Sequence, residues 1–317
     1  MVSPAPVVDV PPQPWTGRFD GDGAEHRRWW QAVTPYAPHR TESVSARAAV
    51  ILGFGSDAGV RRNKGRAGAA NAPAAIRAAL GPLAFHLGRE VYDAGDVTVA
   101  GDALESGQAR AGLAVTGLLD AGQLPVVLGG GHETAFASYL GVAGSAAVRQ
   151  GLRVGVLNLD AHFDLRDEAV PSSGTPFLQM ARAEAAAGRA LKYAVVGISE
   201  PNNTRALFRA AEELGVDYLL DEDCAAEPAR AFVAAFLAQV DAVYLTIDLD
   251  VLPASVAPGV SAPAAYGVPL PVISAVCRQV AASGKLLHLD VAELNPEFDI
   301  DGRTAKVAAR LINTLLR

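Results

Sequence analysis

The sequence predicts one α/β domain in which helices cover both faces of a mainly parallel β-sheet, a three-layer helix–sheet–helix arrangement. Short runs rich in β-branched residues alternate with alanine-rich stretches of helical length, and Gly or Pro separates them. That alternation is typical of βαβ units, which build parallel sheets with helices on their faces. Half of the 317 residues are hydrophobic, so the chain can bury a sizeable core.

The expected elements follow from this alternation, which begins at about residue 46. We expect strands at residues 48–54, 125–128, 154–159, 193–198, 242–247 and 286–291. We expect helices at residues 73–80, 106–121, 204–214, 228–240, 271–282 and 304–316. Residues 1–45 are rich in proline and are expected to form an irregular N-terminal arm, whereas residues 46–317 contain no linker or repeat and are expected to form a single domain.

The bulk properties exclude several classes of protein. The formal net charge is −7 and no basic cluster is present, which argues against a nucleic-acid partner. No apolar segment reaches the ~20 residues of a membrane span, and no basic region precedes an apolar stretch as in a secretory signal. Cys224 and Cys277 form no CxxC pair, so we expect inert core thiols in a reduced, cytoplasmic protein.

Three expected strands end in polar clusters. GGGHE at 129–133, DAHFD at 160–164 and DLD at 248–250 each directly follow a strand. Ligands of open α/β sheets bind outside the carboxyl ends of the strands. In extended chain, residues i, i+2 and i+4 share a face, so the acidic and histidine side chains within each cluster are expected to point the same way. The candidate metal ligands are His132, Asp160, His162, Asp164, Asp248 and Asp250.

Four carboxylates cannot converge unless cations neutralise them, and two divalent ions bridged by carboxylates would do so. Oxygen and imidazole ligands without a thiolate favour two Mn²⁺ ions over Mg²⁺, Co²⁺ or Zn²⁺. Such a pair would share a water whose pKa falls towards neutrality. Taken singly, His132 could be a turn residue, a DxH or DxD could cap a helix, and residues 129–131 could cradle a phosphate. No Gly-Lys-Ser/Thr or dinucleotide fingerprint supports the last alternative.

These motifs resemble the ureohydrolase family, which includes arginases, agmatinases and formimidoylglutamases. The resemblance runs from about Ile51 to the C-terminus and implies an arginase-like fold. Its motifs are NKGRAGA (63–69), GGGHE (129–133), NLDAHFD (158–164), TIDLDVLP (246–253), PGVS (258–261) and DVAELNP (290–296).

The resemblance also implies roles for individual residues. One metal would be held by His132, Asp160, Asp164 and Asp248, and the other by Asp160, His162, Asp248 and Asp250, with Asp160 and Asp248 bridging. Asp164 would carry a proton from the nucleophilic water to the leaving amine. Glu293 would bind the N–H groups of an amidine, although it could instead be a surface residue after a strand. The family commonly forms homo-oligomers.

The substrate depends on the segment Ser172-Ser173-Gly174-Thr175. Arginases and agmatinases carry a His-Gly pair here, whereas Ser173 with Gly174 and Thr175 resembles formimidoylglutamases. Arg166 could bind a substrate carboxylate bidentately and would repel a guanidino substrate, unless it is a solvated loop residue. Asn202 or Asn203 could contact a second carboxylate.

The resemblance therefore implies hydrolysis of N-formimidoyl-L-glutamate to L-glutamate and formamide, a step of histidine degradation. Three alternatives stay open: a ureohydrolase acting on agmatine, guanidinobutyrate or a related guanidino compound, a non-catalytic metal-binding relative, and a single-zinc amidohydrolase of the deacetylase type. The last needs only one DxH and one Asp, fewer ligands than this chain carries.

Overall fold

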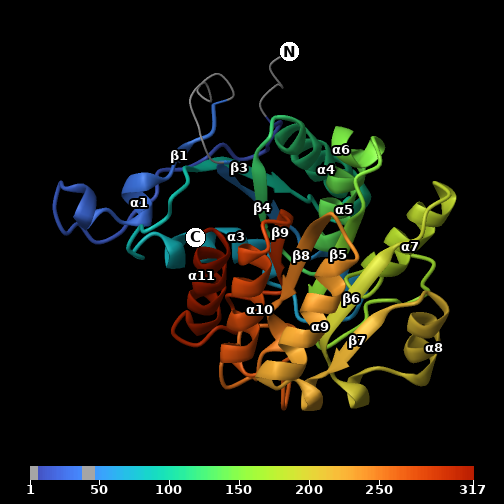
Figure 1. Cartoon of the computed structure of the whole chain (residues 1–317). Coiled ribbons are helices and arrows are strands. Elements are labelled where there is room, and N and C mark those ends of the chain that lie inside the picture. The colour runs from blue at the N-terminus through green and yellow to red at the C-terminus, as the bar shows by residue number, and fades with distance from the viewer. Residues whose placement is uncertain (1–5, 38–46) are drawn as a thin grey trace.

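The computed structural model describes residues 6–37 and 47–317, which form a twisted sheet enclosed by helices (Figure 1). The strands are β1 (Thr34–Pro35), β2 (Ala49–Gly55), β3 (Val91–Thr98), β4 (Leu124–Leu128), β5 (Val154–Leu159), β6 (Lys192–Ile198), β7 (Asp217–Leu220), β8 (Ala242–Asp248) and β9 (Leu286–Ala292). The helices are α1 (Trp29–Ala32), α2 (Ala58–Arg62), α3 (Ala72–Leu80), α4 (Leu104–Asp120), α5 (Thr134–Gly144), α6 (Ala146–Arg149), α7 (Pro176–Ala186), α8 (Arg205–Glu213), α9 (Ala226–Ala238), α10 (Leu270–Ala282) and α11 (Arg303–Leu315).

In the described ranges, the nine strands follow the order β1-β3-β2-β4-β9-β8-β5-β6-β7, and every neighbouring pair is parallel. The chain builds one half of the sheet up to β4, crosses to β5, and later returns to insert β8 and β9 between them. The carboxyl ends of β4, β9, β8 and β5 therefore lie side by side at the place where the strand order reverses, the usual position of a ligand site in such sheets.

Helices cover both faces of the sheet, which confirms the predicted three-layer α/β fold. Helices α3, α9, α10 and α11 pack on one face, while α4, α5, α7 and α8 pack on the other. Figure 1 shows α9, α10 and α11 in front of the sheet. Successive residues of β2 show how both faces are buried, because Ile51 joins the first layer and Val50 and Leu52 join the second.

All six expected strands and all six expected helices are present, with ends within two residues of the expected ones. Strands β3 and β7 and helices such as α5 and α7 were not expected from the sequence. The sequence of β3 contains Asp93, Gly95 and Asp96, residues depleted in strands. Its buried Asp93 is compensated by Arg77, whose Nε lies 2.9 Å from Asp93 Oδ2.

The described part of the proline-rich arm packs on the body of the protein. Trp29 is fully buried, and its Nε1 donates a hydrogen bond to Asn313 Oδ1 at 3.0 Å. Trp15 Nε1 donates to Asp93 Oδ2 at 2.7 Å, and β1 adds a short strand to the sheet edge. The predicted boundary at residue 45 lies outside the described residues, so the division into arm and domain stays a prediction.

Both cysteines are buried and unpaired, and burial raises the pKa of the Cys224 and Cys277 thiols to about 12. Such thiols are poor nucleophiles. None of the helices that the structure describes is long and apolar enough to cross a membrane.

Candidate metal centre

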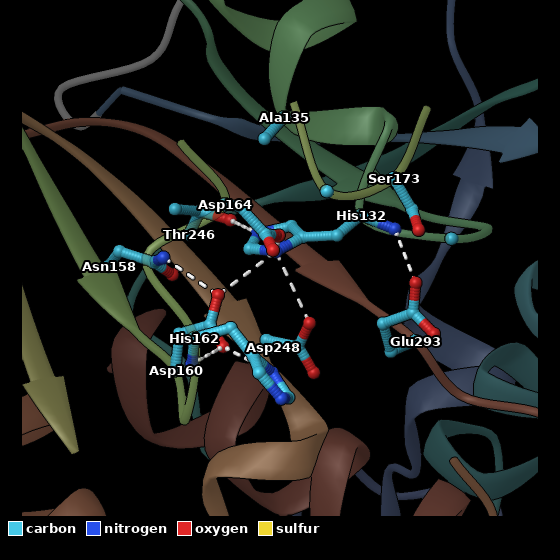
Figure 2. A network of polar contacts seen from close by, with 12 residues as sticks. His132, Ala135, Asn158, Asp160, His162, Asp164, Ser173, Thr246, Asp248 and Glu293 are labelled. Atoms are coloured by element: carbon cyan, nitrogen blue, oxygen red, sulfur yellow. Dashed lines mark hydrogen bonds and ion pairs between the residues drawn. The ribbon is translucent and has the colours of Figure 1, made fainter. Parts of the chain in front are cut away.

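The six candidate ligands converge at the carboxyl ends of three central strands, β4, β8 and β5, of which β8 and β5 are neighbours and β4 is separated from β8 by β9. His132 follows β4, the Asp160–Asp164 segment follows β5, and Asp248 and Asp250 stand at and just after the end of β8. His132, Asp160, Asp248 and Asp250 are each at most 4% exposed. Figure 2 shows the His132 ring among the carboxylates of Asp160, Asp164 and Asp248.

The ligands converge through turns and not through the extended chain that the sequence analysis assumed. Strand β5 ends at Leu159, and Asp250 lies in a short 3₁₀ helix (Leu249–Val251). At both strand ends an aspartate accepts a hydrogen bond from the backbone N–H two residues later: Asp160 Oδ1 from His162 at 2.7 Å, and Asp248 Oδ1 from Asp250 at 2.8 Å. This repeated Asx turn brings the second ligand back beside the first.

The first group of ligands has the spacing of one coordination sphere. His132 Nδ1 lies 2.9 Å from Asp164 Oδ2, 3.1 Å from Asp160 Oδ2 and 3.2 Å from Asp248 Oδ2. Metal–ligand bonds of about 2.1 Å at right angles place neighbouring ligand atoms about 3 Å apart. The four side chains therefore fit around one hexacoordinate cation, and they form one of two candidate cation groups in the described residues.

The second group consists of Asp160, His162 and Asp250. His162 Nδ1 lies 3.2 Å from Asp250 Oδ2 and 3.5 Å from Asp160 Oδ1. The two oxygens of Asp160 thus face different groups, as a bridging carboxylate requires. Asp248 belongs to the first group only, so its expected second bridging role stays a prediction. Asp250 Oδ1 is buried without a hydrogen-bond partner among the described residues, an arrangement that a cation would satisfy.

The electrostatics of the site call for added positive charge. Burial and the charges of Asp250 and Asp160 raise the pKa of the Asp248 carboxyl well above its usual value. Burial alone would lower the pKa of His132, but its hydrogen bonds to Asp160 and Asp164 contribute to raising it well above the usual value. The Asp248 carboxyl and the His132 imidazole both favour their protonated forms here, and divalent cations would supply the missing charge.

Glu293 follows β9 and faces the same site. Its Oε1 accepts a hydrogen bond from the backbone N–H of His132 at 2.7 Å, which links the ends of β9 and β4 (Figure 2). Burial, reinforced by the charges of Glu133 and Asp250, raises the pKa of Glu293 to about 8. Glu293 is 5% exposed, so the alternative of an exposed surface residue is wrong.

A cleft of about 310 Å³ lies over these side chains. Arg166 and Ser173 both line it. The Arg166 side chain lies against Gly174, because a Cβ there would stand 2.8 Å from Arg166 Cδ. Ser173 Oγ accepts a hydrogen bond from Asn63 Nδ2 at 3.1 Å.

Two residues in the cleft differ from the expectation. Asn203 donates both amide hydrogens to backbone carbonyls, those of Ala161 and Ser199, each at 2.9 Å. It therefore holds the turn after β5 and has no amide hydrogen left for a carboxylate, whereas the Asn202 side chain makes no such bond to any residue that the structure describes. The sequence analysis also missed Lys64, which lines the cleft. The motif at 63–69 was the available signal.

Comparison with known proteins identifies the family to which the chain belongs. Residues 47–317 match the arginase family. The chain is 60% identical to a formimidoylglutamase of Nocardia farcinica over 302 residues, which cover 95% of this chain and 95% of that protein. It is 56% identical to a formimidoylglutamase of Rhodococcus opacus, over 97% of this chain and 96% of that protein.

Solved structures agree in fold. A Trypanosoma cruzi formiminoglutamase with Mn²⁺ is similar with a TM-score of 0.77 and 25% identity, covering 87% of this chain and 95% of that one. A Bacillus subtilis formimidoylglutamase matches with a TM-score of 0.80 and 19% identity over 94% of this chain and 95% of that one.

Proposed function

Because the chain belongs to the arginase family, we propose that it is a binuclear metal hydrolase that cleaves N-formimidoyl-L-glutamate to L-glutamate and formamide. The observation that carries this proposal is the pair of Asp/His groups at the carboxyl ends of the central strands in a chain 60% identical to a formimidoylglutamase. The reaction adds water across the amidine carbon and releases the glutamate nitrogen as an amine, so it is a C–N hydrolysis that belongs to histidine degradation.

The metals would be held by the two groups described above. Manganese is the proposed ion, because the donors are carboxylate oxygens and imidazoles and because the similar Trypanosoma cruzi structure contains Mn²⁺. When bound, a pair of divalent cations supplies a water of lowered pKa for attack on the amidine carbon and neutralises charge that develops there.

The chain's own residues would orient the substrate and move the proton. Asp164 Oδ2 lies at the edge of the first group, 2.9 Å from His132 Nδ1, and its side chain is 13% exposed towards the cleft. It would take the proton that the water loses as the C–O bond forms and deliver it to the glutamate nitrogen as the C–N bond breaks. Among the described residues, Glu293 Oε2 accepts no hydrogen bond, which leaves it to accept an amidine N–H.

Substrate selection would come from the cleft wall. Arg166 is exposed and has no ion-pair partner among the described residues, so its guanidinium can bind a substrate carboxylate. Ser173 uses its oxygen to accept from Asn63 and keeps its own hydrogen for the substrate, and Asn202 is the candidate for the second carboxylate. A cationic guanidino group would meet repulsion from Arg166, which disfavours the ureohydrolase alternative.

A homo-oligomeric state and a cytoplasmic location are further proposals, carried only by the family resemblance. Sedimentation velocity of the purified chain tests the first.

The function is tested by a substrate panel with Mn²⁺-loaded protein. Formamide is measured after incubation with formimidoylglutamate, and urea after incubation with agmatine, arginine or guanidinobutyrate. We expect formamide from the first compound and no urea. Urea from any guanidino compound without formamide would reject the substrate and retain a metal hydrolase. No product in spite of two bound metals would point to the non-catalytic alternative.

A further inference from the structure

A buried acidic side chain stands behind the metal ligand His132. Asp290, on β9, is 0% exposed and forms no ion pair with Lys or Arg in the described ranges. It accepts two hydrogen bonds from β8: one from Thr246 Oγ1 at 2.5 Å and one from the Tyr244 hydroxyl. Burying an acidic side chain without a cation is costly, so the presence of Asp290 at this position calls for a physical explanation.

The sheet places these groups in a row that ends at the metal centre. Tyr244, Thr246 and Asp248 alternate along β8 and share one face, and Thr246 pairs in register with Asp290 of β9. Tyr244 therefore holds one oxygen of Asp290 while Thr246 holds the other, so the carboxylate cannot rotate freely. Figure 2 shows Thr246 beside the His132 ring, on the side away from Glu293.

The direction of each hydrogen bond follows from the number of hydrogens. A threonine hydroxyl has one hydrogen, and Thr246 donates it to Asp290 Oδ1. Thr246 Oγ1 lies 3.1 Å from His132 Nε2, and towards this nitrogen it can only accept. Nε2 must then carry the ring hydrogen, which leaves the lone pair of the neutral ring on Nδ1, the atom that faces Asp160, Asp164 and Asp248.

We propose that Asp290 is a positioning residue of the metal centre: through Thr246 it fixes the tautomer of His132 that presents the Nδ1 lone pair to the first cation. This inference rests on the proposed metal centre and adds a residue to it that touches neither metal nor substrate. Partners of this kind orient a ligating histidine, and their loss typically weakens metal binding about 10- to 100-fold.

The proposal makes opposite predictions for two substitutions at one position. In Asp290→Ala, the Thr246 hydroxyl loses its acceptor and can turn to donate to His132 Nε2, which moves the ring hydrogen to Nδ1 and blocks the first cation. In Asp290→Asn, the amide oxygen still accepts from Thr246, while the amide N–H donates to Tyr244, whose hydrogen can turn to the Ala135 carbonyl oxygen 3.1 Å away. The hydrogen bonds that fix the His132 tautomer through Thr246 are therefore kept, although the negative charge is lost.

Thr246 supplies a second matched pair. Thr246→Val keeps the shape and removes the hydroxyl, so Nε2 loses its acceptor and the tautomer is no longer fixed. Thr246→Ser keeps the hydroxyl and is expected to bind metal as the unchanged protein does. This pair keeps the proposal testable if Asp290→Ala fails to fold, which thermal melting followed by circular dichroism would reveal.

The experiment is a Mn²⁺ titration of the full chain, followed by calorimetry and by the spin-coupled electron paramagnetic resonance signal that requires both sites to be filled. We expect one of the two binding steps to weaken about 10- to 100-fold in Asp290→Ala and Thr246→Val, with the other step unchanged. Asp290→Asn and Thr246→Ser should bind both Mn²⁺ ions with the affinities of the unchanged protein.

The inference is overturned if Asp290→Ala and Thr246→Val bind both Mn²⁺ ions with the affinities of the unchanged protein. It is also overturned if Asp290→Asn loses as much Mn²⁺ affinity as Asp290→Ala, because the negative charge and not the His132 tautomer would then be responsible. Failure of the unchanged protein to bind two Mn²⁺ ions would instead reject the proposed metal centre itself, so the two failures are distinguishable.

Discussion

His288 is expected to make the centre of the sheet sensitive to acid. It is fully buried on β9, its ring lies 5.1 Å from that of Tyr244, and burial lowers its pKa to about 3. In the unfolded chain the pKa of histidine is about 6.5. The unfolded state therefore binds a proton that the folded state does not, and the contribution of His288 to stability, complete above pH 6.5, is lost as the pH falls towards 3.

Between pH 7 and pH 5, the loss of folding free energy does not depend on the pKa of His288 in the folded protein, provided that this pKa lies well below 5. Protonation of the unfolded state alone costs about 2 kcal/mol of folding free energy between pH 7 and pH 5. His288→Phe keeps a ring of similar size and cannot titrate. Any packing change that it introduces shifts the free energy of unfolding equally at both pH values.

The assay is urea unfolding of both proteins at pH 7 and pH 5 with the same Mn²⁺ concentration, so that metal release enters both comparisons alike. The original chain should lose about 2 kcal/mol more than His288→Phe between the two pH values. An equal loss in both proteins would mean that folded His288 accepts a proton readily, and the reasoning from burial would be refuted.

Three further predictions concern the site. Arg166→Ala should raise KM for formimidoylglutamate roughly 5- to 30-fold in initial-rate kinetics, with little change in kcat. This rise corresponds to about 1–2 kcal/mol for an exposed charge-assisted hydrogen bond. The surface variant Arg182→Ala should leave both constants unchanged. Glu293→Gln should lower kcat about 100-fold or more at unchanged metal content, and normal turnover would show that Glu293 does not bind the amidine. Asp250→Asn should reduce tightly bound Mn²⁺ from two ions to one per chain by elemental analysis after dialysis, and two retained ions would exclude Asp250 as a ligand.

The site residues could be predicted because their spacing is local. The Asp-x-His and Asp-x-Asp clusters name the candidate ligands directly, but the Asx turns that bring these side chains together were not predicted, because extended chain was expected there. The order of the strands could not be predicted in the same way. Nothing local in the sequence says that β8 and β9 return to lie between β4 and β5, yet this crossover brings His132 and Glu293 to the aspartates.

The partner that a side chain contacts could not be predicted from the sequence either. Asn202 or Asn203 was expected to contact a substrate carboxylate, but the amide of Asn203 holds the backbone of residues 161 and 199. Strand β7 was missed because it is short and lies at the sheet edge, where its residues are half-buried or exposed and show no run of buried apolar residues. The Ala161 carbonyl that Asn203 holds is 42 residues away in the sequence, so no local pattern could reveal this bond.

Backbone strain gives an independent indication of where function lies. Asp164 and Glu293 have φ angles of 49° and 68°, a left-handed conformation that costs a residue with a Cβ roughly 1–2 kcal/mol. Both are held there by bonds to neighbouring segments: the Asp164 carbonyl accepts from the Phe177 N–H at 3.3 Å, and the Glu293 N–H donates to the Gly130 carbonyl at 2.8 Å. Glycine would relieve the strain at either position but would remove the carboxylate. Two further described non-glycine residues have positive φ, Lys64 in the cleft wall and Asp301 outside it, so three of the four such residues line the cleft and two of them carry the carboxylates to which we assign proton transfer and amidine binding.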